Sequence, residues 1–163
     1  MDMKYVNLLI PILLLVTSGC DEQAFHSAFP PEGYFDPIII NELERDVLNY
    51  SGEIVHRYGG DYSISLSFEK ANPVGKGYGL PPLHLKCSYT DEGRMKQVPC
   101  GNSLLPYWGE ESGLSIGIYS VPATVKQGEP VTFSLEFLEH EELENILESY
   151  GKVTLMIKKW SDL

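Results

Sequence analysis

The chain has 163 residues, 43% of them hydrophobic, which fits one globular domain rather than two. Twelve Lys and Arg residues stand against 23 Asp and Glu residues, so the formal net charge is −11. A protein this acidic is repelled by nucleic acids and by bare anionic lipid head groups, which makes nucleic-acid binding the class of function that the composition excludes first. A basic protein partner or a cation is compatible with the charge.

Residues 1–20 have the pattern of an export signal rather than of a folded domain. Lys4 precedes the apolar stretch "YVNLLIPILLLV", and the small residues "TSG" lead to Cys20. A charged start, an apolar segment of about a dozen residues and small residues before a cleavage point are typical of a secretory signal. The stretch is broken by Pro11 and is shorter than the about 20 apolar residues of a membrane-spanning helix. An ordinary signal peptide with a chance Cys and an uncleaved anchor are the alternatives.

The stretch "TSGC" resembles the lipobox of bacterial lipoproteins. The resemblance implies cleavage just before Cys20, diacylation of its thiol and acylation of its new amino group. Two or three acyl chains hold a protein firmly at a membrane, whereas one chain binds only marginally. We therefore predict a signal peptide over residues 1–19, a lipidated tether over 20–36 and one domain over 37–163, with lipidated Cys20 as the contact with the membrane.

Asp21, the residue after Cys20, bears on the membrane in which the protein is expected to lie. In enterobacterial lipoproteins, Asp directly after the lipidated Cys commonly means retention in the inner membrane. The resemblance thus implies the periplasmic face of the inner membrane, with the outer membrane as the alternative. The layout of lipobox, tether and a β-rich domain with a "YSxSLxF"-like strand also resembles small lipoproteins of Gram-negative bacteria, a likeness that implies no activity.

Four segments alternate apolar and polar residues in the period-two pattern of a half-buried strand. They are "DYSISLSFE", "GLSIGIYSV", "PVTFSLEFLE" and "GKVTLMIKK", and in the first of them three Ser form the face opposite the apolar residues. Weaker patterns predict strands over residues 37–40, 53–57, 83–89 and 95–98. The residues expected to share an apolar face are Tyr62, Ile64, Leu66 and Phe68; Leu114, Ile116 and Ile118; Val131, Phe133, Leu135 and Phe137; and Val153, Leu155 and Ile157.

About eight short strands with Gly/Pro-rich connections indicate an antiparallel β-sandwich. The segment "VPATVKQGEPVTFSLEF" resembles the opening strands of immunoglobulin-like modules, in which a Gly-Glu turn precedes a strongly alternating strand. The predicted class is therefore mainly β: an antiparallel immunoglobulin-like β-sandwich of about eight strands, with one or two short helices.

Two segments have helical spacing. "EHEELENILESYG" places apolar residues three and four apart and ends at Gly151, a suitable cap. "NELERDVLNY" is the candidate for a second short helix. The residues expected to face inward are Leu143, Ile146, Leu147 and Tyr150 in the first, and Leu43, Val47 and Tyr50 in the second.

Cys87 and Cys100 remain as a pair once Cys20 is set aside. An even number of Cys in an exported chain argues for a disulfide, because the compartment is oxidising. A turn at "DEGR" between two extended arms predicts a hairpin that brings the two together, diagonally or across a bulge. Two free thiols are one alternative. A metal site is the other, and the lack of a C-x-x-C or C-x-x-H arrangement counts against it.

No motif in the sequence predicts catalysis. The chain has no G-x-S-x-G elbow before a helix, no H-E-x-x-H motif and no phosphate loop. We therefore predict no catalytic residue, no metal, no cofactor and no enzymatic activity, while a triad assembled from distant residues stays open. No pair of His sits at metal-ligand spacing on one element; the four are His26, His56, His84 and His140.

The run "EFLEHEELENILE" gathers six Glu around His140. Such a face can dock a basic partner, raising the association rate more than the affinity. A solvated helix face is the plain alternative, and a cation site is another. Within this run we select Glu139, Glu141 and Glu142 as candidate partner-binding residues.

The segment "LLPYWGEESG" places Tyr107 and Trp108 in a predicted loop bounded by Pro and Gly. Aromatic residues on loops are common anchors of protein contacts, so these two are candidate partner-binding residues as well. The alternative is that they plug the end of the sandwich core.

Size, charge and address together favour a lipid-anchored periplasmic protein-binding module. One form of it is an immunity or inhibitor protein that neutralises an envelope-acting toxin or hydrolase, because such targets are often basic. A structural accessory lipoprotein of an envelope assembly is the alternative, and a hydrolytic enzyme is the third hypothesis. The expected partners are the membrane, through the N-terminal lipid, and a protein, but no nucleic acid.

Overall fold

The computed structural model describes residues 29–69, 83–91, 93–107, 112–121 and 128–160. The chain falls into two units, Met1–Tyr34 and Phe35–Leu163. Of the first unit only residues 29–34 are described; they include a turn in which the Tyr34 N–H donates to the Pro31 carbonyl at 3.0 Å. Every strand and helix described below belongs to the second unit.

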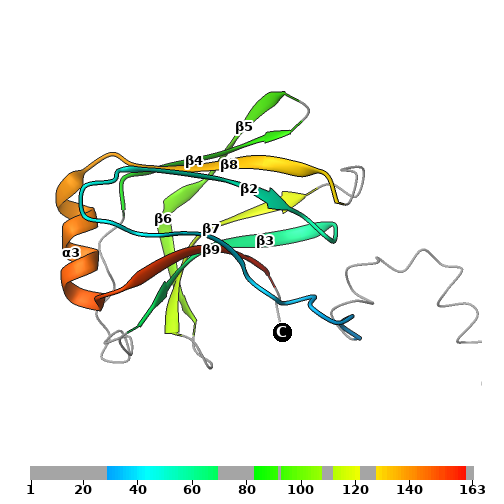
Figure 1. Ribbon diagram of the computed structural model, residues 1–163, viewed down its shortest axis with the longest axis horizontal. Helices are drawn as coiled ribbons and strands as arrows, with labels where there is room; N and C mark the ends of the chain where they lie inside the picture. The colour runs from blue at the N-terminus through cyan, green and yellow to red at the C-terminus, as the bar shows by residue number, and fades with distance from the viewer. Residues whose placement is uncertain (1–28, 70–82, 92, 108–111, 122–127, 161–163) are drawn as a thin grey trace, which may run out of the picture. The chain divides into compact units, whose positions relative to one another are not determined.

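Two antiparallel sheets make up most of the described part of the second unit, which confirms the mainly β, sandwich-like class. One sheet has the order β1-β9-β3-β7-β6 and the other the order β2-β8-β4-β5. Figure 1 shows them as two layers, with β2, β4 and β8 on one side and β3, β7 and β9 on the other. The strands are β1 (Ile38–Glu42), β2 (Asn49–Val55), β3 (Gly60–Phe68), β4 (Leu85–Asp91), β5 (Arg94–Val98), β6 (Cys100–Tyr107), β7 (Ser112–Val121), β8 (Pro130–Phe137) and β9 (Val153–Lys159).

Eight of these strands lie where the sequence predicts a strand, with ends that differ by a few residues. The sequence does not predict β6, because Gly101 and Pro106 give that segment the composition of a loop. Pro is tolerated on edge strands, where its missing N–H breaks no ladder hydrogen bond. β6 is such an edge, paired only with β7 among the described strands.

The core lies between the inner faces of the two sheets. Along β8 the predicted alternation is confirmed, with Phe133 fully buried and its neighbour Thr132 exposed. Across the other sheet, Leu66 of β3 lies opposite Leu155 of β9, so aliphatic pairs form between strands. The largest fully buried side chains are Ile54, Ile64, Leu66, Leu114, Ile116, Phe133, Leu135, Phe137, Leu143, Ile146, Leu155 and Ile157.

The Ser face of β3 is less exposed than a half-buried strand would leave it. Ser63 and Ser65 keep only 3% and 1% of their surface accessible. The Ser63 hydroxyl lies 2.8 Å from that of Ser65 and 2.6 Å from that of Ser115 on β7. Buried hydroxyls that hydrogen-bond to one another avoid the free-energy cost of an unsatisfied polar group. This explains how a polar face can be buried here.

A bulge in β7 corrects the predicted face of that strand. Ile64 pairs with Gly117 but Ser65 pairs with Ser115, so Ile116 is an extra residue in the ladder. One extra residue reverses the alternation beyond it. Ile118 consequently lies opposite Ser63, on the other face from Leu114, and Tyr119 takes the inward position predicted for Ile118.

Residues 41–50 do not form the second helix that their spacing suggests. β1 ends at Glu42, a turn follows, and β2 begins at Asn49. The Tyr50 hydroxyl accepts from the Glu44 N–H at 2.9 Å and donates to the Glu44 carbonyl at 3.0 Å, which holds the turn. Asn41 and Glu42 pair with β9, and Asn49 and Tyr50 pair with β8, so both ends of the segment use backbone groups that a helix would have needed.

The predicted helix is confirmed as α3 (His140–Tyr150). Its N-cap is Glu139, and its C-cap Gly151 has a φ of 74°, a conformation that favours glycine. Leu143, Ile146 and Tyr150 are buried. In Figure 1 the helix connects β8 to β9 at one end of the two layers. There the Tyr150 ring stacks on that of Phe68, with centroids 4.0 Å apart.

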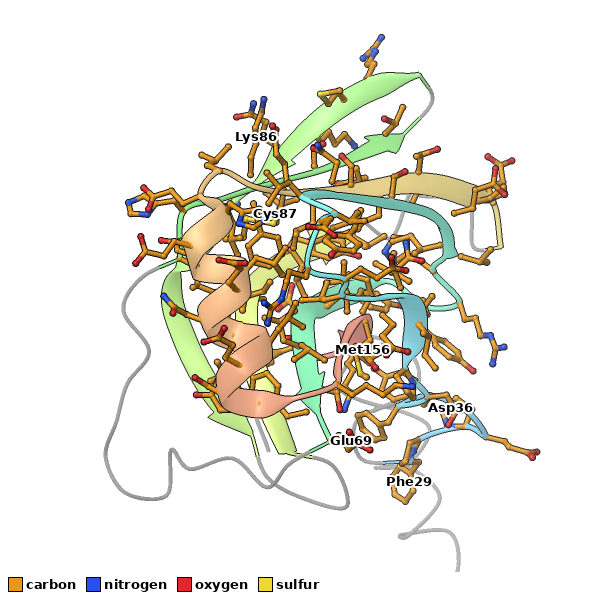
Figure 2. The ribbon with its side chains drawn as sticks, turned by 60° about the vertical axis from the view of Figure 1, so that its left-hand side comes forward. Phe29, Asp36, Glu69, Lys86, Cys87 and Met156 are labelled. Carbon is orange, nitrogen blue, oxygen red and sulfur yellow. A yellow bond between two sulfur atoms is a disulfide. The ribbon has the colours of Figure 1, made fainter. Side chains whose placement is uncertain are left out.

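Cys87 and Cys100 form the predicted disulfide, with Cα atoms 6.2 Å apart. The predicted hairpin is confirmed, with Cys87 opposite Val98, but Cys100, two residues beyond Val98, begins β6 in the other sheet. The disulfide therefore joins the two sheets. On β4 in Figure 2, Lys86 points away from the sandwich and Cys87 points into it.

Glycine is required where the chain crosses from one sheet to the other. A Cβ at Gly101, which has a φ of 81°, would lie 2.0 Å from the Leu83 carbonyl oxygen. A Cβ at Gly117 would lie 2.6 Å from the Pro99 carbonyl oxygen. These close approaches bring β6 under β4 and beside β7, and they position the disulfide.

Cys20 and the predicted signal peptide lie outside the described residues. Among the residues that are described, no helix is both long and apolar enough to cross a membrane.

We predict that replacing both Cys87 and Cys100 by Ser lowers the free energy of unfolding by about 3 kcal/mol, because the open chain gains the entropy of an unclosed loop. Urea unfolding of the full chain measures this. Wild type in reductant is the control, and it should match the double variant. Equal stability of variant and oxidised wild type would contradict the prediction.

Candidate functional site

Three of the predicted partner-binding residues meet at the first turn of α3. Glu139 and Glu141 are exposed, and Glu142 is partly buried. Carboxylates in the first turn interact favourably with the positive end of the helix dipole, so they have a local structural role as well. They also leave an acidic patch on the surface, which we call the acidic turn (Glu139, Glu141 and Glu142).

His84 joins the acidic turn from β4's side of the sandwich. Its Nδ1 lies 2.6 Å from Oε1 of Glu142 and 3.3 Å from Oε1 of Glu139. Its backbone N–H donates to Oε2 of Glu142 at 2.7 Å, so one carboxylate holds both the backbone and the ring of the same residue. This double contact fastens the start of β4 to the start of α3.

Strand pairing explains why these residues meet. Leu85, the first residue of β4, lies opposite Phe137, the last residue of β8. The next pair outward is His84 and Leu138, and the Leu138 N–H donates to the His84 carbonyl at 2.9 Å. Because α3 begins two residues later, its first-turn carboxylates reach the His84 ring.

The carboxylates raise the pKa of His84 above its ordinary value of 6.5. The hydrogen bond to Glu142 is the largest cause, and the negative charges of Glu139 and Glu142 add to it. The side chain of His84 is 62% exposed, so water screens the ion pair. At mildly acidic pH the ring carries a positive charge that partly neutralises the acidic turn.

His140, which the sequence places at the centre of the acidic run, has a different neighbour. Its Nδ1 lies 3.7 Å from Oε2 of Glu144. Glu144 and Glu148 also lie 4.0 and 3.5 Å from the guanidinium of Arg45. The later turns of α3 thus carry paired charges. Sequence reasoning missed His84, because only the register of β4 against β8 reveals its place.

Of the two aromatic candidates, the structure describes the backbone of Tyr107. Tyr107 is the last residue of β6 and pairs with Gly113, so it does not belong to the predicted loop. Its side chain and the whole of Trp108 lie outside what the structure describes.

His56 lies in the core at the other end of the sandwich. Its Nε2 lies 2.7 Å from the Tyr119 hydroxyl, and its ring meets that of Tyr62 edge to face at 4.7 Å between centroids. Burial raises the pKa of Tyr119, and neighbouring Tyr62 and Tyr89 raise it further. The Tyr119 hydroxyl therefore stays protonated beside the His56 ring. Lys159 adds a contact over the Tyr62 ring, 4.6 Å from its centroid. The arrangement is a hydrogen-bonded part of the core.

Comparison with known proteins gives no family for this geometry. No family model matches the chain, and neither a curated protein nor a solved structure matches it.

We predict that the His84 pKa, measured by NMR on the full chain in excess chelator, lies above 6.5 and falls in Glu142→Gln. Because the pKa of His84 is higher in the folded state, its protonation stabilises the fold below the unfolded-state pKa. This stabilisation is lost as the pH rises through the folded-state pKa. The stability lost in Glu142→Gln should therefore be larger at pH 6 than at pH 8. Resonances of His140, which pairs with Glu144 instead, report any change that is not local. A His84 pKa at or below 6.5 would refute the interpretation.

Proposed function

We propose that this chain is a lipid-anchored protein-binding module of the bacterial cell envelope. The lipobox-like residues before Cys20 support an anchor, and Asp21 supports the periplasmic face of the inner membrane, with the outer membrane as the alternative. Asp2 and Lys4 are the charged residues of the predicted signal and cancel each other, so removal of residues 1–19 leaves the charge at −11.

The observation that carries the binding function is the acidic turn of α3. Glu139 and Glu141 are exposed there, and within the described residues Arg45 offsets acids only on the later turns of the helix. A concentrated negative patch on a protein of charge −11 attracts a basic partner and raises the rate of encounter. The partner is therefore a basic protein of the envelope.

The specific form that we favour is an immunity or inhibitor protein. An anchored acidic module stays where a basic toxin or hydrolase acts, so anchoring and charge serve the same task. The mechanism is blockage by binding and needs no catalytic group.

The proposal includes a narrower fold, an immunoglobulin-like sandwich. Its supports are two antiparallel sheets, a disulfide between them, and the resemblance of residues 121–137 to the opening strands of such modules.

We predict that Cys20→Ala releases the protein from the membrane fraction, because no acyl chain can then be attached. Cell fractionation and immunoblotting measure the distribution. Ser27→Ala, a similar small change outside the lipobox-like residues, is the control and should remain with the membrane. A Cys20→Ala protein that stays in the membrane fraction would show that the lipid anchor is wrong.

We predict that Glu141→Lys weakens capture of the partner about tenfold at low salt, because it reverses one exposed charge in the patch. Glu53→Lys makes the same change of charge on β2 and is the matched control. Both variants are compared with wild type by affinity capture from envelope extracts, after thermal unfolding confirms that each is folded.

Selective loss in Glu141→Lys supports docking at the acidic turn. Equal binding by all three proteins would exclude this surface, and recovery of no protein by any of them would count against a binding module. A partner that is recovered at constant ratio, and is an envelope component rather than a toxin, would favour the structural accessory role.

A further inference from the structure

The side chains of His84, Glu139 and Glu142 bring three metal-binding atoms to one place. One atom is an imidazole nitrogen and two are carboxylate oxygens, and all three lie within 4.8 Å of one another. Glu142 belongs to the first turn of α3 and Glu139 is its N-cap, while the imidazole comes from the residue just before β4. This set differs from a plain cluster of acids, because it includes a nitrogen donor from a separate segment.

The backbone holds the donors close together. The Leu138 N–H donates to the His84 carbonyl at 2.9 Å, and the Leu83 N–H donates to the Gly101 carbonyl at 3.0 Å. Three residues beyond His84, the disulfide of Cys87 ties β4 to the opposite sheet. A ligand set that is placed by paired strands and a helix start loses little freedom on binding.

The distances suit a small divalent ion. Zinc binds nitrogen and carboxylate oxygen at about 2.1 Å, which separates tetrahedral donors by about 3.4 Å. The His84 Nδ1 and the Glu139 Oε1 are already 3.3 Å apart. The Glu142 oxygen lies 2.6 Å from the ring nitrogen, so it needs to move by less than about 1 Å to exchange its hydrogen bond for a metal bond.

We propose that His84, Glu139 and Glu142 form a binding site for a divalent transition metal of the zinc class, here named the His84 site. An imidazole with two carboxylates suits zinc and its neighbours in the first transition row, whereas calcium and magnesium prefer sites made entirely of oxygen. This is contrary to the sequence-based expectation of no metal. It goes beyond the proposed function and does not depend on it.

The charges and the exposure of the three ligands determine how the ion is bound. The ion bonds to the deprotonated Nδ1, so any proton held there is released to solvent as the metal–nitrogen bond forms. Two carboxylates then balance the two charges of the ion. Because His84 and Glu139 are both more than half exposed, water completes the coordination. A bound ion ties the start of β4 to the start of α3, and it stabilises the fold in proportion to its occupancy.

The chain contains its own matched control. His140 is also an exposed imidazole beside a carboxylate, 3.7 Å from Glu144. Glu144, however, is shared with Arg45, whose fixed positive charge opposes a cation. A His140→Ala variant therefore loses an imidazole of similar exposure without loss of the proposed site.

The experiment titrates Zn²⁺ into the chelator-treated full chain by isothermal calorimetry, for wild type, His84→Ala, Glu142→Gln and His140→Ala. We expect one equivalent in wild type and in His140→Ala, and binding at least tenfold weaker in the two site variants. A free Cys20 thiol, where present, is common to all four proteins and cannot produce this difference. Binding within twofold of wild type in His84→Ala, or equal loss in His140→Ala, would overturn the proposal.

A second measurement needs no variant and covers the case in which a variant fails to fold. Zn²⁺ is added stepwise to the wild-type protein while the imidazole resonances are followed by NMR. Shifts of the His84 ring at the first equivalent, ahead of those of His140, support the site. Simultaneous shifts of both rings, or the same response to Mg²⁺, would show only a general attraction of cations to the acidic surface and would overturn the proposal.

Discussion

Leu85 of β4 lies opposite Phe137 of β8, and most of the candidate site depends on this pairing. It places His84 beside Leu138, directly before α3 begins. The first-turn carboxylates then reach the imidazole without any long loop between them. A shift of one residue in the register would turn the side chains of β4 to the opposite face and carry His84 away from Glu142. The pairing of β4 with β8 thus determines the position of the acidic turn relative to His84.

The disulfide and two glycines maintain the same arrangement from the other side. Cys87 of β4 is joined to Cys100 of β6, so the sheet that carries His84 is tied to the opposite one. Gly101 and Gly117 allow the backbones to approach closely where the chain changes sheets. The polar group of His56 and Tyr119 fills the other end of the core. The hydrogen-bonded pair of His56 and Tyr119 thus lies at the end of the sandwich opposite the acidic turn.

The proposed function depends on how charge is distributed along α3. The later turns of α3 hold their carboxylates near Arg45, whereas Glu139 and Glu141 at the start of the helix are exposed. Attraction of this kind acts over about a Debye length and favours encounter with a basic partner. His84 moderates the patch, because its own charge and any ion that it shares with Glu142 reduce the local negative potential. The negative potential of the proposed docking surface therefore depends on the protonation of His84 and, through the proposed His84 site, on bound metal.

Local spacing and composition were enough to predict the strands with strong alternation, the helix over residues 140–150, the disulfide partners and the acidity of the helix. They did not determine β6, the bulge at Ile116, the turn that replaces a helix near Tyr50, or the joining of two sheets by Cys87 and Cys100. Those features depend on which strand lies beside which, and a neighbour that is distant in the chain leaves no local pattern. The meeting of His84 with Glu142, 58 residues away, was decided in the same manner by the tertiary structure alone.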